Sequence, residues 1–232
     1  MKQFVCQVTT LESLTTQVYQ VILRLPEPIE FLAGQYIHVV MGEHDKRAFS
    51  IASCPSRTTT IELHIGATPD NSYAQEVISR MQQEGVVTIE APLGDAWLRR
   101  DSERPLILIA GGTGFSYTWS ILQAHLRSGS VRPVTLYWGA RRPQDLYFDE
   151  HLRELAAAHE HFHYRPVVEQ APELWHGAQG LVHEAVVAEQ TDLHEADIYV
   201  AGRFEMVRVI RDEFKARGLP SEQLYGDALA SI

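Results

Sequence analysis

The feature that most constrains the fold is a glycine-rich turn between an apolar strand and a helix. The strand is the uninterrupted apolar run 106–110, the glycine-rich segment 111–114 follows, and residues 115–126 repeat apolar side chains at helical spacing. A strand without polar alternation is typical of a parallel sheet covered on both faces. Glycines let the backbone approach a phosphate closely, and the N-terminus of the following helix favours its negative charge. The turn therefore predicts a nucleotide or dinucleotide site near residues 110–116.

The turn departs from the usual dinucleotide fingerprint. Tyr117 stands where a third glycine would be, and the next apolar strand ends without the carboxylate that usually binds a ribose hydroxyl. Arg141 and Arg142 occupy that strand end instead. The segment lacks the Gly-Lys-Ser/Thr of a P-loop, which excludes that motif. A plain tight strand–helix turn is the alternative interpretation.

Composition bounds the class of protein. The chain has 232 residues, a formal net charge of −10 and 45% hydrophobic residues, which suits one large domain or two small ones. The negative charge argues against nucleic acid and anionic membranes as partners. Two cysteines exclude a four-cysteine iron–sulfur centre and fit a reducing compartment. Neither a signal-peptide core nor an apolar run of transmembrane length is present, so we expect a cytoplasmic protein.

The two halves of the chain have different patterns. The first half predicts six short strands, at 4–8, 18–25, 36–40, 48–52, 60–65 and 86–90. It also predicts one helix at 73–83 that buries Ala74, Val77, Ile78 and Met81. The second half predicts strands at 106–110, 134–138, 164–168 and 198–201, alternating with helices near 115–127, 149–158, 181–189 and 204–217.

These patterns predict a two-domain β + α/β fold. An antiparallel Greek-key β-barrel over 1–98 precedes a Rossmann-like parallel sheet over 105–232, with helices on both faces of that sheet. The charged stretch 98–104 suits a short linker between the two.

Four segments in this order resemble the ferredoxin–NADP⁺ reductase superfamily, and particularly its small bacterial NAD(P)H:flavin oxidoreductases. They are Phe-Leu-Ala-Gly-Gln-Tyr at 31–36, Arg-Ala-Phe-Ser at 47–50, Gly-Gly-Thr-Gly at 111–114 and Ala-Gly-Arg-Phe-Glu-Met at 201–206. The resemblance covers essentially the whole chain. Three positions depart from the family pattern: Ala48 replaces a frequent proline, Ala201 replaces a cysteine and Arg203 replaces a proline.

The resemblance implies a flavin site on the barrel. Ser50 would hydrogen-bond flavin N5 and is the candidate catalytic residue, whereas an ordinary strand-end serine is the plain alternative. Arg47 would anchor the ribityl chain or a flavin phosphate, or else be a solvated charge. Phe49 would contribute a ring or backbone contact, and Ala48 its backbone alone. A turn containing Pro92 and Gly94 would close over the flavin, although a plain turn explains these residues nearly as well.

The resemblance also implies a pyridine-nucleotide site in the second domain. Its expected residues are Gly111, Gly112, Thr113 and Gly114, with Phe115 and Ser116 beginning the helix. Arg141, together with Arg142, is a candidate for adenosine phosphate, including a 2′-phosphate. Gly202, Phe204 and Met206 would form a second loop beside the nicotinamide, although a helix-core role explains Met206 equally well.

The expected activity is NAD(P)H-dependent reduction of free flavin, by hydride transfer from nicotinamide C4 to flavin N5. NADH or NADPH is the expected donor, and riboflavin or FMN, less well FAD, the expected substrate or weakly bound flavin. A flavin-dependent monooxygenase or luciferase is a candidate acceptor. The alternatives are a reductase that retains its flavin and serves a protein partner, and a binding module without turnover. His159, His161 and His163 share strand spacing, but a solvated loop explains them, and we expect no metal site.

Overall fold

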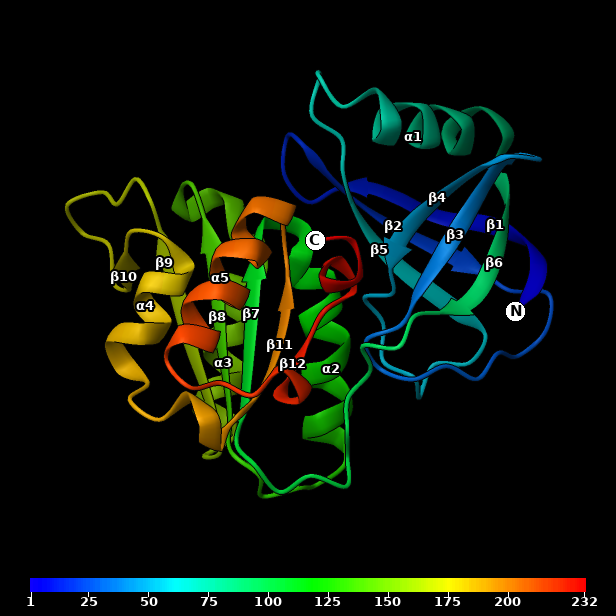
Figure 1. The fold of residues 1–232 in the computed structure, drawn as a ribbon. Helices are drawn as coiled ribbons and strands as arrows, with labels where there is room; N and C mark the ends of the chain where they lie inside the picture. Colours follow the sequence, from blue (N-terminus) through cyan, green and yellow to red (C-terminus); the bar gives the residue numbers. More distant parts are fainter. The chain divides into compact units, whose positions relative to one another are not determined.

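The computed structural model describes residues 1–232, which form two compact units. The first unit comprises residues 1–98 and 119–124, and the second comprises residues 99–118 and 125–232. Each contains a six-stranded sheet (Figure 1). The segment 99–104, expected as a linker, therefore groups with the second unit.

The first unit is an antiparallel, barrel-like sheet. Its strands are β1 (Lys2–Ser13), β2 (Val18–Arg24), β3 (Tyr36–Gly42), β4 (Asp45–Ser50), β5 (Thr60–Gly66) and β6 (Val86–Leu93), in the order β4-β3-β6-β1-β2-β5. Beyond β4, the Ala52 N–H donates to the Glu62 carbonyl of β5 at 2.8 Å, which brings the two ends of the sheet together. With β6 beside β3, strands β3 to β6 have the Greek-key arrangement.

The six predicted strands are confirmed, although their boundaries differ, most of all in β1 and β4. Strand β1 continues to Ser13 because Leu11 and Ser13 pair with Val21 and Tyr19 of β2. Strand β4 lies at Asp45–Ser50 instead of 48–52, because it pairs with β3 across a tight connection. Short-range pairing thus extends the strands through residues whose side chains carry no strand pattern.

Helix α1 (Ser72–Glu84) packs on the barrel core as predicted. Its buried side chains are Ala74, Val77, Ile78 and Met81. The Asn71 side chain caps the helix by accepting the Ala74 N–H at 3.2 Å. Gly85 ends the helix in the left-handed region. The opposite, polar face of α1 stays available for contacts with strand side chains.

The second unit is built on a parallel sheet. Its strands are β7 (Leu106–Gly111), β8 (Val134–Ala140), β9 (Phe162–Val168), β10 (Ala178–Gln179), β11 (Asp197–Ala201) and β12 (Leu224–Tyr225), in the order β10-β9-β8-β7-β11-β12. The four predicted strands are confirmed. The edge strands β10 and β12 are additional, because two residues are too few to show a strand period.

Four predicted helices cover both faces of this sheet (Figure 1). They are α2 (Phe115–Arg127), α3 (Asp149–Ala158), α4 (Val182–Glu189) and α5 (Phe204–Ala216). Helices α4 and α5 share a core with alternate residues of the strands, including Ile109. On the other face, Phe115 stacks on Trp138 and Asp149 of α3 accepts the Tyr164 hydroxyl at 2.6 Å. None of the helices has both the length and the apolar character needed to cross a bilayer.

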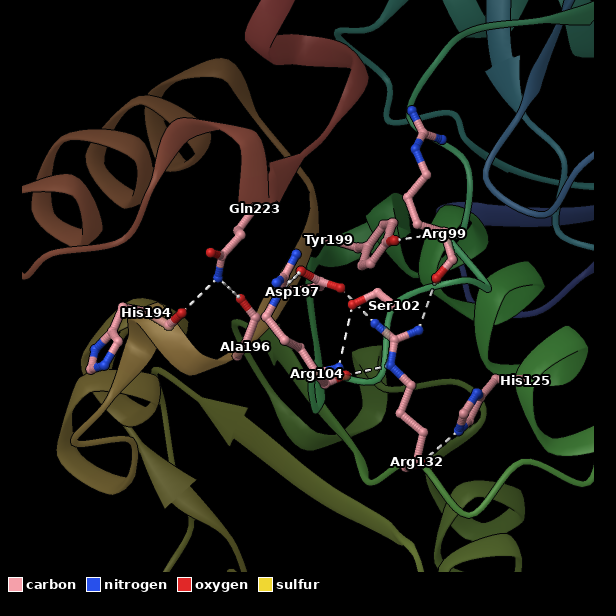
Figure 2. Close-up of polar contacts among 10 residues, drawn as sticks. All are labelled: Arg99, Ser102, Arg104, His125, Arg132, His194, Ala196, Asp197, Tyr199 and Gln223. Atoms are coloured by element: carbon pink, nitrogen blue, oxygen red, sulfur yellow. Dashed lines mark hydrogen bonds and ion pairs between the residues drawn. The ribbon is translucent and has the colours of Figure 1, made fainter.

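A buried ionic network holds the start of the second unit to its sheet (Figure 2). Asp197, the first residue of β11, is fully buried and accepts from Arg104 at 2.8 Å and Arg132 at 2.6 Å. Arg132 also donates to the Arg99 carbonyl at 2.9 Å, and the Arg99 N–H donates to the Tyr199 hydroxyl at 2.8 Å. Residues 99–104 are therefore fixed to this sheet by side-chain contacts.

Candidate functional site

Strand β3 brings the expected flavin-site residues to one end of the barrel. Tyr36 pairs with Ser50 of β4 on one side and with Leu93 of β6 on the other, so Ser50 lies across one strand from Pro92 and Gly94. The Gln35 side chain donates to the Gly94 carbonyl at 3.0 Å. The predicted members Ser50, Pro92 and Gly94, which are far apart in sequence, thus come to the same end of the sheet on either side of β3.

The Ser50 hydroxyl has no hydrogen-bond partner within the chain. The side chain is partly exposed at the last position of β4 and makes no hydrogen bond within the protein. A serine hydroxyl can donate one hydrogen bond and accept two. The position therefore suits a donor to a ligand atom such as a flavin ring nitrogen.

Arg47, by contrast, is held closely by the protein itself. Its side chain is 9% exposed and forms a two-pronged pair with Asp45, Nε to Oδ1 at 2.9 Å and Nη2 to Oδ2 at 2.7 Å. Nη2 also donates to Glu76 of α1 at 2.7 Å, and Nη1 donates to the Tyr73 carbonyl at 2.7 Å. Hydrogen bonds to Asp45 and Glu76 raise the pKa of Arg47 above its usual range. The predicted flavin anchor therefore has protein carboxylates as its partners in the structure.

Tyr73, at the start of α1, lies against the same strand. Its hydroxyl accepts the Ala48 N–H at 3.1 Å, and its ring contacts Phe49 with the centroids 6.2 Å apart. The Phe49 side chain also packs against the barrel core. The sequence analysis missed Tyr73 and Glu76, since only the apolar face of α1 has a recognisable pattern. The one available signal in the sequence is an aromatic residue at the predicted start of the helix. In the structure, the Tyr73 side chain is 47% exposed.

The glycine turn after β7 lies directly against the loop after β11. A β-carbon on Gly114 would be 2.3 Å from the Ala201 carbonyl oxygen. A β-carbon on Gly111 or Gly202 would be 2.6 or 2.4 Å from the side chain of Met206. Because β7 and β11 are neighbours in the sheet, with Ala110 opposite Ala201, these predicted site residues come together.

Aromatic side chains of β8 and α2 hold the glycine turn in place. Gly112 adopts a positive φ of 54°, and its carbonyl accepts the Trp138 indole N–H at 3.0 Å. The buried Phe115 ring stacks on Trp138, with centroids 4.0 Å apart and planes 11° apart. Phe115, one of the predicted cofactor-binding residues, holds the loop through its buried ring and through its N–H, which bonds back to Gly112 and Thr113. Sequence reasoning missed Trp138 because a tryptophan in an apolar strand looks like ordinary core.

The turn fits a phosphate-bearing ligand. Gly112 is exposed, and Thr113 and Gly114 are partly exposed, immediately before the N-terminus of α2. Ser116 in the first turn of that helix is 2% exposed, and its hydroxyl oxygen has no hydrogen-bond partner. A buried hydroxyl without a partner is costly unless a ligand or water satisfies it. Together with the helix dipole, these groups suit an anionic nucleotide.

Other predicted residues lie around this turn. Arg141 follows β8 and has an exposed side chain without a partner in the chain, whereas Arg142 lies 3.6 Å from Asp145. Phe204, at the start of α5, is 53% exposed. Tyr117, which replaces the fingerprint glycine, is buried, and burial raises its pKa well above the ordinary value. A buried tyrosine ring therefore stands where the fingerprint would place a glycine.

Two further histidines lie outside the predicted flavin and nucleotide sites. His64 lies 3.0 Å from the Glu62 carboxylate, which also accepts from Gln20 at 2.7 Å. His163 is exposed on β9. The chain contains no group of three or more His, Cys, Asp or Glu side chains placed to hold a metal ion.

Comparisons with known proteins match both halves of the chain. Residues 5–97 match the oxidoreductase FAD-binding domain, and residues 108–212 match the oxidoreductase NAD-binding domain. The chain is 47% identical to an NAD(P)H-flavin reductase from Vibrio harveyi, over 98% of each sequence. It is also 47% identical to an NAD(P)H-flavin reductase from Aliivibrio fischeri, again over 98% of each.

A solved structure shows the same fold. A ferredoxin NADP⁺ reductase from Neisseria gonorrhoeae, with FAD and NADP bound, superposes with a TM-score of 0.83 at 20% identity, over 98% of each chain. The predicted fold class, a β-barrel followed by a Rossmann-like parallel sheet, is confirmed.

Proposed function

The chain belongs to the NAD(P)H-flavin reductases, and on that basis we propose that it reduces free flavin with NADH or NADPH as the electron donor. The nicotinamide supplies a hydride to flavin N5 when both ligands are bound. Neither ligand needs a strong acid or base from the protein. What the chain has to provide is binding, orientation and exclusion of water.

The main support for this flavin site is that the partly exposed Ser50 hydroxyl has no hydrogen-bond partner within the chain. In this proposal the hydroxyl donates to flavin N5, with Ala48 and Phe49 beside it on β4. Pro92 and Gly94 line the neighbouring strand end. The glycine turn at Gly111, Gly112, Thr113 and Gly114 holds the pyrophosphate and nicotinamide ribose, and Ser116 satisfies its hydroxyl on the same ligand. Gly202, Phe204 and Met206 border the nicotinamide, and Arg141 serves the adenosine phosphate.

We further propose that flavin behaves as a substrate and leaves after reduction. Reduced flavin would then be consumed by a flavin-dependent acceptor enzyme of the monooxygenase or luciferase class. The two cysteines, both buried free thiols, are compatible with a reaction in the cytoplasm, where reduced pyridine nucleotide is made.

The test is oxidation of NADH and of NADPH by the purified protein with riboflavin, FMN and FAD added in turn. We expect nucleotide oxidation that depends on added flavin, and a nearly colourless protein after gel filtration. Stoichiometric flavin that survives dialysis would instead favour a flavin-retaining reductase. No oxidation with any flavin would rule out the proposed activity.

A further inference from the structure

The surroundings of Arg47 determine what kind of flavin tail it can accept. A guanidinium has five N–H donors, and four of those of Arg47 are engaged by Asp45, Glu76 and the Tyr73 carbonyl. The guanidinium carbon also lies over the Tyr73 ring, 5.0 Å from its centroid. A ligand phosphate would have to displace a carboxylate or share the guanidinium with two of them.

The charges at this position give an anion no net attraction. Asp45 and Glu76 are 49% and 58% exposed, so both carboxylates border the solvent through which a ligand arrives. Arg47 hydrogen-bonds to Asp45 and thereby lowers the pKa of that carboxyl, which keeps it charged. Arg80 acts on Asp45 from the next turn of α1, and its guanidinium donates to the Met41 carbonyl at 2.8 Å. Two acids in direct contact therefore offset the single charge of Arg47.

We propose that Asp45 and Glu76 set the flavin preference of this chain by neutralising Arg47, so that a flavin with a neutral ribityl hydroxyl is favoured over a phosphorylated one. The inference rests on the proposed flavin site at β4. A phosphate monoester carries about −1.5 to −2 charges at neutral pH, whereas the ribityl chain of riboflavin is uncharged. Asp45 and Glu76 are specificity-determining residues that act through Arg47, and they take no part in hydride transfer.

The competing interpretation has the opposite sign. If the two carboxylates orient Arg47 for a phosphate, their removal would weaken FMN binding, as expected when a positioned cation loses its support. If they instead neutralise it, their removal frees Nη2 donors and uncovers a positive charge, and FMN binding improves. The direction in which the ratio of the KM for FMN to the KM for riboflavin changes therefore distinguishes the two interpretations.

The experiment compares the KM for FMN with the KM for riboflavin at saturating NADH, in the wild-type protein and in Glu76→Gln, Asp45→Asn and Glu84→Gln. Glu84→Gln is the matched control, because it removes the same charge from the far end of the same helix. We expect the FMN-to-riboflavin KM ratio to fall about three- to tenfold in Glu76→Gln and in Asp45→Asn. In Glu84→Gln we expect a change of less than about twofold.

Salt provides a second measurement that a purely structural role would not affect. Raising the salt concentration from about 20 mM to about 300 mM shortens the Debye length and screens the charge that the substitution uncovers, so the KM ratio of Glu76→Gln should rise toward that of the wild type. A ratio that is unchanged or increased relative to the wild type in both variants would overturn the inference while the riboflavin reductase activity stands. A wild-type protein that does not oxidise NADH with riboflavin would overturn the proposed function, and this inference with it.

Discussion

At Ser50 the chain offers a hydroxyl to solvent, and three residues earlier on β4 it surrounds Arg47 with its own acids. Flavin chemistry needs a donor at the reacting nitrogen but no fixed cation there. We therefore propose different roles for the free hydroxyl and the engaged guanidinium. In this proposal the hydroxyl acts on the rate of hydride transfer, and the guanidinium acts on which flavin binds.

Replacing Ser50 with alanine tests the first of these roles. Loss of one positioned donor at the reacting atom is expected to cost about 2–4 kcal/mol of transition-state stabilisation. The rate of flavin reduction should then fall by roughly tenfold to a thousandfold. Single-turnover reduction at saturating NADH measures this step, and Ser79→Ala, at an exposed position of α1, is the control. An unchanged rate in a folded Ser50→Ala protein would remove Ser50 from the mechanism.

His125 makes stability depend on pH. Burial lowers its pKa below the ordinary value of 6.5, although its hydrogen bond to the Arg132 carbonyl at 2.8 Å opposes the shift. The folded state therefore takes up this proton less readily than the unfolded state, and stability should fall as the pH drops below about 6.5. His125→Gln should reduce that slope in urea unfolding between about pH 7 and pH 5, whereas the exposed His163→Gln should retain it. Equal slopes in the wild type and His125→Gln would contradict this.

Candidate site residues could be identified from the sequence only where the pattern is local. The glycines form a recognisable turn between a strand and a helix, and Ser50 stands in a short motif that resembles one of a known family. The partners of Arg47 could not be found in that way, because Tyr73 and Glu76 come from a helix more than 20 residues further along the chain. Nothing in the polar face of α1 distinguishes Glu76 from Glu84.

At the scale of elements, long periodic segments were predictable and short ones were not. Helix α2 was predicted at its observed bounds, since its apolar residues repeat over three turns. Strands β10 and β12 form through backbone pairing with β9 and β11. With two residues each, they are too short to show a strand pattern in the sequence. The turn between β7 and α2 was predicted from its glycines, but not its contact with the loop at Ala201.

Gly114→Ala tests that contact between elements. A methyl group would meet the Ala201 carbonyl at 2.3 Å, so the turn and the β11 loop must separate. We expect a loss of about 1–3 kcal/mol in stability, as for other overpacked sites, together with weaker NADH binding. Urea unfolding and NADH titration measure the two effects.

Gly129→Ala is the matched control for this substitution. Gly129 has a positive φ of 71°, and a β-carbon added to it would have no atom within 4 Å. It also follows the far end of α2, away from the glycine turn. The variant should lose stability through backbone strain alone and keep its NADH affinity. Equal NADH affinities in the two variants would contradict a role for the close approach at Gly114.

At the scale of the whole molecule, the division into a barrel and a nucleotide sheet follows from the two sequence patterns. The sequence patterns do not show that residues 99–104 belong to the second unit, because a charged segment between two patterned regions is typical of a solvated linker. The structure instead uses Arg99 and Arg104 as partners of Tyr199 and Asp197 (Figure 2). Likewise, residues 119–124 of α2 group with the first unit, where Ser120 donates to the Ser53 carbonyl at 2.8 Å.

Asp197→Ala tests how much the second unit depends on this network. The substitution leaves Arg132, whose side chain is 7% exposed, as a buried cation without its carboxylate. Removing one partner of a buried ion pair costs about 3–5 kcal/mol, because the remaining charge stays out of water. Arg104 is 47% exposed, so Arg104→Met should cost only about 1 kcal/mol or less. Urea unfolding followed by tryptophan fluorescence compares the two variants with the wild type. Equal losses in the two variants would show that solvent reaches Arg132 once Asp197 is gone, and that the network contributes no more than a surface ion pair.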